Sequence, residues 1–150
     1  MVLNAESTGL PDLSFDLVVV QDGLHHLQNP VGGFTEMLRI ARVAVIMLEP
    51  HEALVGRLIG TQWERDGAAV NYVFRWTRRL VEDVASSFLG PDSFKNLSFS
   101  FWHHNPVYGK IGTAAGGGKI GLGIVKTIKI VLDTMFSGKG NMMCGLIIKR

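Results

Sequence analysis

Cysteine, proline and long apolar runs are all scarce in this chain of 150 residues. The single cysteine, Cys144, excludes a disulfide framework and any zinc site built from several cysteines. Because a chain without paired cysteines suits a reducing compartment, we expect a cytoplasmic protein. The longest strictly apolar segments, such as 43–48, are far shorter than the roughly 20 residues that a membrane-spanning helix needs. No basic segment precedes an apolar stretch at the start, which argues against a signal peptide.

Acidic residues are scarce in the last third of the chain. Residues 101–150 hold seven Lys and Arg and one Asp, net +6, whereas residues 1–50 are net −4 and the whole chain is +2. A basic region of this kind favours anionic partners, but a solvated lysine face on one helix is the commoner explanation. We therefore expect no nucleic-acid partner, and we keep peripheral membrane contact as the less favoured alternative. With 47% hydrophobic residues, the chain has enough apolar material for a core.

The spacing of apolar residues predicts an open α/β sheet. Valine-rich runs at 15–20 and 43–48 indicate parallel strands buried on both faces, and a helix over 31–42, with Pro30 in its first turn, connects them in a βαβ unit. Further along, we predict a short helix at 52–60, an irregular loop or lid at 64–75, a helix at 78–88 with Thr77 as N-cap, a strand at 97–102, a flexible glycine-rich loop at 109–123, a helix at 124–136 and a last strand at 142–148.

Three segments together resemble a known family. Residues 10–27 read LPDLSFDLVVVQDGLHHL, residues 36–42 read EMLRIAR, and residues 45–50 read VIMLEP. They resemble the region from the fourth to the fifth strand of class I S-adenosylmethionine-dependent methyltransferases, of the methyltransferase type 11 kind. A weaker similarity, NYVFRWTRR at 71–79, resembles the entry into a later helix. The resemblance implies a Rossmann-like α/β fold, S-adenosylmethionine as cofactor, and methyl transfer to a small-molecule or lipid-like acceptor.

The resemblance also predicts how much of that domain the chain contains. The family's sheet order is 3-2-1-4-5-7-6, and the N-terminal strands with the Gly-rich cofactor loop have no counterpart here. We therefore expect residues 1–150 to form a single partial methyltransferase domain with strands 4, 5, 6 and 7. Residues 106–140 would form a variable insertion with an amphipathic helix before the last strand. The strand at 15–20 would then be an exposed apolar edge, which predicts self-association or low stability.

The alternative function is that of a fragment without activity, or of a basic surface-binding module that does not bind the cofactor alone. Cofactor-binding candidates come from the resemblance and from the rule that ligands bind at the carboxyl ends of parallel strands. Asn4 and Ala5 match the family's adenine contact, and Gln21 matches the residue that closes over the methionine part. Asp22 and Gly23 follow at the end of the same strand.

His25 and His26 are the candidate catalytic residues. An imidazole titrates near neutral pH, so one of the two could take a proton from the methyl acceptor. Adjacent residues of a regular element face different directions, so we expect that the two histidines do not both face the same point of a site. The favoured interpretation is structural, with the two histidines opening a turn through hydrogen bonds.

Acceptor-binding candidates lie further along the chain. Glu49, at the end of a strand, either reaches the acceptor or caps the following helix, and the residues do not favour one over the other. Tyr72, Arg75 and Trp76 could shape an acceptor pocket, but such aromatic residues more often belong to a core.

Two other patterns give no site. The remaining histidines, His51, His103 and His104, and Cys144 have no recognised ligand spacing, so we predict no metal. Residues 116–121 match GxGxxG, but they lack the preceding strand that a dinucleotide-binding loop requires. In the helix at 124–136, an apolar stripe opposes Lys126 and Lys129, and we expect this stripe to face the core rather than a membrane.

Overall fold

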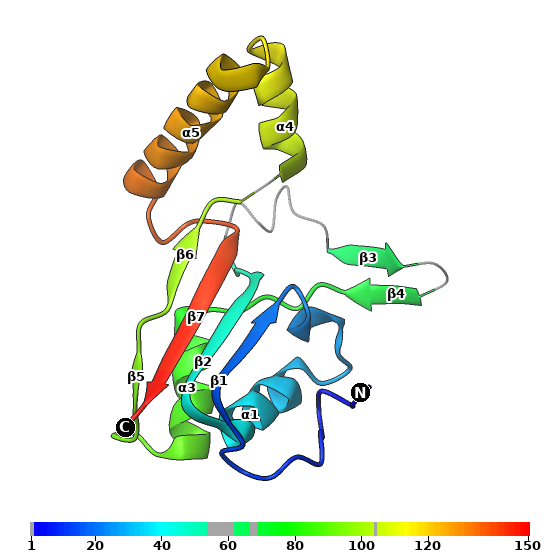
Figure 1. Ribbon diagram of the computed structural model, residues 1–150, viewed down its shortest axis with the longest axis vertical. Coiled ribbons are helices and arrows are strands. Elements are labelled where there is room, and N and C mark those ends of the chain that lie inside the picture. The colour runs from blue at the N-terminus through cyan, green and yellow to red at the C-terminus, as the bar shows by residue number, and fades with distance from the viewer. Residues whose placement is uncertain (1, 54–61, 67–68, 104) are drawn as a thin grey trace.

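A mixed sheet forms the centre of the molecule in the computed structural model, which describes residues 2–53, 62–66, 69–103 and 105–150. Its order is β1 (Phe15–Gln21), β2 (Ala41–Pro50), β7 (Met142–Lys149) and β5 (Phe94–Asn96), and β6 (Phe99–Phe101) also pairs with β7. β1 and β2 are parallel, whereas β7 runs antiparallel to β2 and to both short strands. This is the order 4-5-7-6 that the sequence predicts (Figure 1).

The βαβ unit is confirmed, with small changes in its boundaries. Helix α1 (Pro30–Ile40) begins after Asn29, whose side chain accepts a hydrogen bond from the Gly32 amide at 2.8 Å. Pro30 occupies the first turn, where its missing N–H costs nothing. The helix ends two residues earlier than predicted because β2 begins directly at Ala41.

Helix α3 (Arg78–Leu89) is also confirmed, because its start and stop signals are local. The Thr77 hydroxyl oxygen accepts a hydrogen bond from the Leu80 amide at 3.0 Å, as an N-cap residue does. Gly90 ends the helix with φ +92°, a conformation that favours glycine.

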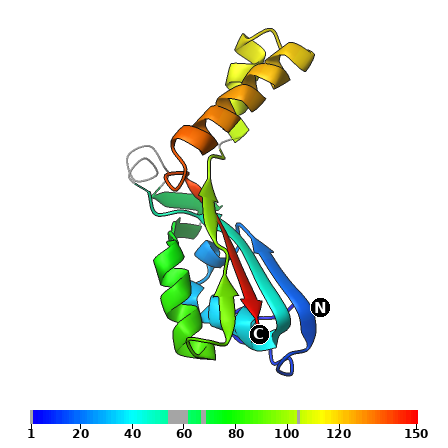
Figure 2. The same cartoon turned by 90° about the vertical axis from the view of Figure 1, so that its left-hand side faces the viewer.

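Helices α1 and α3 lie on the same face of the sheet and bury it (Figures 1 and 2). The core between them contains one large aromatic cluster, in which Trp76 packs against Phe34 and Phe74. The other fully buried large side chains come from α1, α3, β2 and β7: Leu38, Met47, Met143, Ile147, Glu49, Val45 and Val81.

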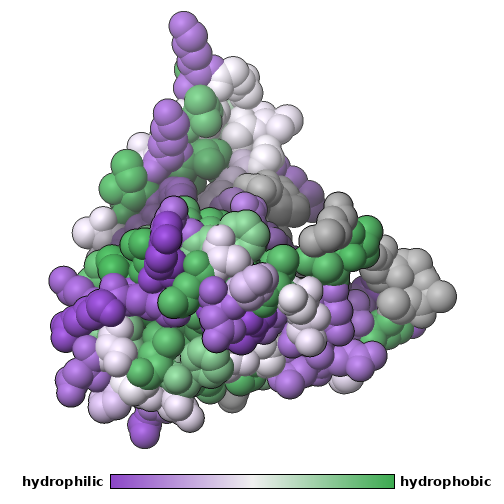
Figure 3. All heavy atoms as spheres, turned by 60° about the horizontal axis from the view of Figure 1, so that its bottom comes forward, coloured by the Kyte–Doolittle hydropathy of each residue, from purple (hydrophilic) through white to green (hydrophobic). Residues whose placement is uncertain are grey.

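The prediction that the strand at 15–20 is buried on both faces is wrong. Val18 and Val20 pack against the core, but Leu17 is 51% exposed and Val19 56% exposed. Because successive side chains of a strand point to opposite faces of the sheet, Leu17 and Val19 lie on the face opposite to the one that α1 and α3 bury, and no described helix covers that face. β1 is also an edge of the sheet, since no described strand pairs with its open side. The expectation of an exposed apolar edge is thereby confirmed. Figure 3 shows hydrophobic residues at the surface among hydrophilic ones.

The segment predicted as an irregular loop at 64–75 contains a β-hairpin instead. β3 (Trp63–Asp66) pairs antiparallel with β4 (Ala69–Tyr72), and the rings of Trp63 and Tyr72 lie 5.2 Å apart across the pair. Cross-strand aromatic contacts of this kind stabilise a hairpin. The sequence of one short strand does not show which residue of the other strand will lie opposite it, so these contacts are not visible in the sequence. The predicted helix at 52–60 lies largely outside the described residues, and residues 52–53 are not helical.

The predicted strand at 97–102 is shorter and interrupted. β6 covers only Phe99–Phe101, and β5 precedes it. Between them, the Asn96 side chain accepts hydrogen bonds from the amide and the hydroxyl of Ser98. These local bonds replace ladder bonds and divide the strand into two.

The predicted flexible loop at 109–123 is wrong, because most of it is helical. α4 (Asn105–Ala114) and α5 (Gly118–Met135) form a helical hairpin, here called the arm, that projects from the sheet (Figures 1 and 2). Only the turn between them uses left-handed backbone, at Gly116, Gly117 and Gly118. Where the helices touch, a Cβ on Gly121 would overlap the Gly112 carbonyl oxygen. Glycine therefore brings two helices into contact here, although its usual effect is to weaken a helix.

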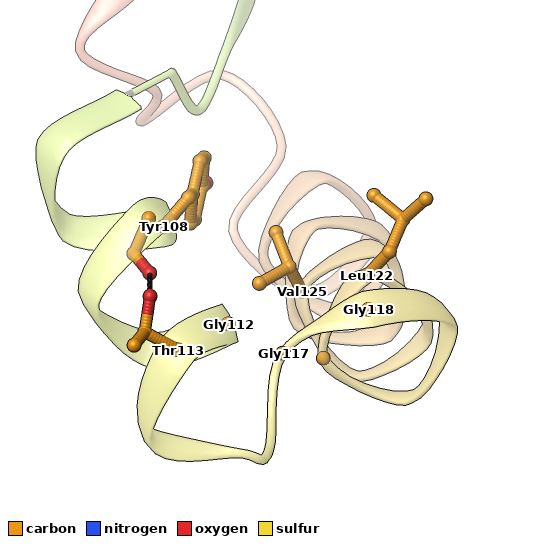
Figure 4. Close-up of a pocket in the computed structure, with 9 residues that line it drawn as sticks. Tyr108, Gly112, Thr113, Gly117, Gly118, Leu122 and Val125 are labelled. Carbon is orange, nitrogen blue, oxygen red and sulfur yellow. Dashed lines mark hydrogen bonds between the residues drawn. The ribbon is translucent and has the colours of Figure 1, made fainter.

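A pocket of about 380 Å³ lies between the helices of the arm, and Val125 points from α5 toward α4 (Figure 4). On the outside of α5, most of the predicted apolar stripe is exposed: Ile124, Val131 and Met135 are open to solvent, and Ile128 is half-buried. The expectation that this stripe faces the core is therefore wrong, because the arm stands away from the sheet (Figure 2). Among the described residues, no helix combines the length and apolar character that a membrane span requires.

Candidate functional site

The candidate site lies where β1 and β2 end. β1 ends at Gln21, and Asp22 and Gly23 lead into a short 3-10 helix, η1 (Leu24–His26). The Asp22 amide donates to the Leu48 carbonyl at 2.9 Å, which extends the β1–β2 ladder past the strand. Asp22 itself has φ +48°, in the left-handed region that aspartate adopts more readily than most residues. The chain thus turns sharply at the carboxyl ends of the parallel strands, where ligands of open α/β folds bind.

Glu49 holds this turn from the neighbouring strand. Its side chain is fully buried, and one carboxylate oxygen accepts the amides of Gly23 at 2.9 Å and Leu24 at 2.8 Å. The other oxygen lies 2.7 Å from Nδ1 of His25 and also accepts the His25 amide at 3.3 Å. Glu49 therefore caps the preceding 3-10 helix, rather than a following helix or an exposed acceptor surface. The sequence predicted a contact with the acceptor or a cap on the following helix, and the structure shows a third arrangement.

The His25–Glu49 contact shifts both groups toward their charged forms. Burial lowers the pKa of His25, but the hydrogen bond and the charge of Glu49 outweigh it, so the His25 pKa lies above its ordinary value. Burial raises the pKa of Glu49, but hydrogen bonds from His25 and from the amides of Leu24 and Gly23 outweigh it, so the Glu49 pKa lies below its ordinary value. Glu49 is thus an ionised acceptor of hydrogen bonds.

The two histidines face one point, contrary to the expectation for adjacent residues. Their ring centroids lie 4.2 Å apart. Nε2 of His25 lies 3.6 Å from a carboxylate oxygen of Glu64, and Nε2 of His26 lies 3.9 Å from the same oxygen. Glu64 belongs to β3, and the sequence analysis missed it because no motif marks it.

A pocket of about 290 Å³ opens beside the histidine pair. The hairpin and η1 supply most of its lining, which consists of His25, His26, Leu27, Gln28, Pro30, Val70, Asn71, Tyr72 and Phe74. Of the predicted acceptor residues, only Tyr72 lines it. Trp76 is fully buried in the core, and its amide donates to the Pro50 carbonyl at 2.8 Å. Arg75 is half-buried and donates a hydrogen bond to the Val73 carbonyl at 3.3 Å.

The predicted cofactor residues are mostly exposed to solvent. Asn4, Ala5, Gln21 and Asp22 are exposed, and Gly23 is half-buried. The Asn4 side-chain oxygen accepts the Glu6 amide at 2.9 Å, and the Glu6 side chain in turn accepts the amide of Asn29, at the start of α1, at 2.9 Å. These hydrogen bonds connect the N-terminal segment to the start of α1, which follows η1 in the chain.

The other histidines and the cysteine lie apart from this site. His51 Nδ1 contacts the Gly140 carbonyl at 2.7 Å, His103 follows β6, and Cys144 lies in β7, where burial raises the pKa of its thiol. His104 falls outside the described residues.

Comparisons with known proteins agree with this architecture. Residues 1–47 match the family described as Methyltransferase domain. None of the curated proteins matches the sequence. A crystal structure of an S-adenosylmethionine-dependent methyltransferase from Thermotoga maritima, described as a possible histamine N-methyltransferase, has a TM-score of 0.58 at 15% identity, over 98% of this chain and 62% of its own.

Two further solved structures are similar. An S-adenosylmethionine-dependent methyltransferase from Methanosarcina mazei has a TM-score of 0.53 at 15% identity, over 99% of this chain and 66% of its own. The [4+2]-cyclase SpnF has a TM-score of 0.53 at 11% identity, over 99% and 54%. The chain thus spans less than two thirds of the length of these structures. It has the Rossmann-like fold of class I S-adenosylmethionine-dependent methyltransferases, with their sequence pattern in its N-terminal third.

Proposed function

We propose that this chain, with the methyltransferase fold and with residues 1–47 matching the methyltransferase domain family, takes part in S-adenosylmethionine-dependent methyl transfer as the C-terminal part of the catalytic domain. One observation carries the proposal: the matching segment contains β1, η1, α1 and most of β2, and with them the predicted cofactor residues and the histidine pair. The fold by itself does not decide the reaction, since a cyclase shares it.

The chemistry of the predicted cofactor residues fits the polar groups at the two ends of S-adenosylmethionine. The amides of Asn4 and Gln21 both donate and accept hydrogen bonds, as the adenine and the amino-acid part require, and Asp22 offers an acceptor for an ammonium group. Ala5 and Gly23 would contribute backbone groups. When bound, the cofactor supplies an electrophilic methyl group. In this proposal, Asn4 and Ala5 face the base, and Gln21, Asp22 and Gly23 face the methionine part.

The acceptor would enter the pocket beside the histidine pair. Methyl transfer is an in-line displacement, so its rate depends on how well the acceptor is positioned. His25 and His26 supply polar contacts, Tyr72 and Phe74 supply apolar walls, and the pocket of about 290 Å³ suits a small molecule or one end of a lipid-like molecule. Glu49 and Trp76 are positioning residues in this proposal, because Glu49 holds η1 and the Trp76 amide binds the Pro50 carbonyl at the end of β2.

Calorimetric titration of the purified chain with S-adenosylmethionine tests the proposal. We expect saturable heat, and we expect Asp22→Ala to weaken binding at least about tenfold through loss of a charged contact. Asp83→Ala is the matched control, because Asp83 lies exposed on α3, away from the sheet edge. If the chain gives no heat and no thermal shift, it does not bind the cofactor alone, and the alternative of a fragment without activity is favoured.

A second candidate function rests on the arm. Residues 105–135 hold four lysines and one Asp, net +3, and α5 exposes an apolar stripe to solvent. This combination supports contact with an anionic lipid surface, to which apolar side chains and cationic charge both contribute. Co-sedimentation with phosphatidylserine vesicles tests it. Binding should fall with Lys119→Glu and Lys126→Glu together, and binding that persists unchanged counts against it.

A further inference from the structure

The cluster of His25, His26 and Glu64 carries an inference that does not depend on methyl transfer. Each residue offers one ligand atom, and these three atoms lie within 4.8 Å of one another. We propose that they form a binding site for a divalent transition-metal ion of the zinc class. Two imidazoles and one carboxylate are a donor set that such ions accept, with one position left for an exogenous ligand.

The spacing of the three atoms suits an ion better than direct contact. The two Nε2–carboxylate distances, 3.6 and 3.9 Å, are too long for hydrogen bonds. Zinc binds imidazole nitrogen and carboxylate oxygen at about 2.0–2.2 Å, so two ligands of a tetrahedral site lie roughly 3.3–3.6 Å apart. The 3.6 Å distance lies at the upper end of that range and the 3.9 Å distance lies just above it, while all three ligand atoms lie within 4.8 Å of one another. Small movements of the side chains would therefore close the site around an ion.

One ligand is fixed and the other two can adjust. The side chain of His25 is only 4% exposed, whereas those of His26 and Glu64 are each 42% exposed. The buried ring gives the site a fixed anchor, and the two partly exposed side chains can move toward it. The pocket beside the pair gives an ion and a further ligand a way in from solvent.

Glu49 supplies the outer contact that histidine ligands of metals usually have. Its ionised carboxylate can only accept, so Nδ1 of His25, at 2.7 Å, carries the proton. In the neutral ring that binds a metal, Nε2 is then the nitrogen whose lone pair faces Glu64 and His26, and an ion displaces any proton held there. A carboxylate on the far nitrogen orients the ring and makes it a better ligand, an arrangement seen around many metal sites. No sequence motif indicates this site, because the ligands come from η1 and from a hairpin strand.

Titration of the untagged, chelator-treated chain with Zn²⁺, and with Co²⁺ as a spectroscopic probe, tests the proposal. We expect one saturable zinc site, and visible Co²⁺ absorption typical of four-coordinate nitrogen and oxygen ligands. His26→Gln and Glu64→Gln should each weaken zinc binding at least about tenfold. Both side chains are partly exposed, so these variants should fold, and circular dichroism checks that they do. His103→Gln is the matched control for a histidine outside the cluster, and Cys144→Ser controls for the thiol.

The proposal is overturned by any of three results. The chain binds no zinc at micromolar concentration, or binding is unchanged in both His26→Gln and Glu64→Gln, or His103→Gln or Cys144→Ser abolishes it. None of these results bears on cofactor binding, which the titration with S-adenosylmethionine measures separately.

Discussion

Glu49 is the residue on which the candidate site most depends. Its buried carboxylate accepts three backbone amides and the His25 ring. Glu49→Gln removes the charge and directs an NH₂ group toward donors, so the free energy of unfolding should fall by about 3 kcal/mol, as when one partner of a buried ion pair is removed. Urea denaturation measures the loss. Asp83→Asn, in the exposed Arg79–Asp83 pair, should change it by less than about 1 kcal/mol. Equal losses in the two variants would contradict this account.

Glu36 makes the stability of the folded chain depend on pH in the acid range. Hydrogen bonds from Arg39, and then from Thr8, outweigh the effect of burial and lower the pKa of Glu36 from 4.5 to about 2. A carboxyl group with a folded-state pKa below its unfolded-state pKa stabilises the fold above pH 4.5, and this contribution is lost as the pH falls from 4.5 toward 2. Thermal unfolding across that range should show the loss. Glu36→Gln should be less stable at neutral pH and change less with acidification, whereas parallel curves would exclude Glu36 as the cause.

At the scale of elements, two glycines of α5 should respond in opposite ways to the same substitution. A Cβ on Gly121 would overlap the Gly112 carbonyl oxygen, whereas a Cβ on Gly123 meets nothing within 4 Å. Gly121→Ala should separate α4 from α5 and make the arm more sensitive to limited proteolysis. Gly123→Ala should stabilise α5 by up to about 1 kcal/mol, since alanine favours helix. If Gly121→Ala left the proteolysis of the arm unchanged, the close contact would not hold the two helices together.

The elements also show which local sequence patterns are sufficient to predict a helix or a strand. Thr77 and Gly90 delimit α3 because the cap bonds form within one turn of the residue that makes them. The hairpin of β3 and β4 has no such signal, since each strand becomes favourable only when paired. The predicted helix at 124–136 is confirmed within α5, but α4 and the start of α5 were predicted as a loop, because their glycines favour a loop until Gly112 and Gly121 are in contact.

At the scale of the whole molecule, the open edge of β1 should cause self-association. Leu17 and Val19 are more than half exposed on a strand whose outer backbone groups are unpaired within the described residues. Size-exclusion chromatography with light scattering should show species larger than a monomer, increasing with concentration. Val19→Lys should shift them toward the monomer, because a charge on an edge strand opposes pairing. Val70→Lys, in the hairpin, is a matched exposed control. A soluble, cooperatively unfolding monomer at all concentrations would contradict the prediction.

The sequence by itself determined the βαβ unit, the sheet order, helix α3 and the region of the candidate site. These features depend on apolar periodicity, on caps, and on a run of residues that resembles one family, all of which are local. The tertiary structure alone decided that Glu49 is buried under η1, that Trp76 belongs to the core, and that Glu64 faces both histidines. It also decided that the apolar stripe of α5 is open to solvent. Each of these outcomes depends on which distant segments meet, and neither spacing nor composition encodes that.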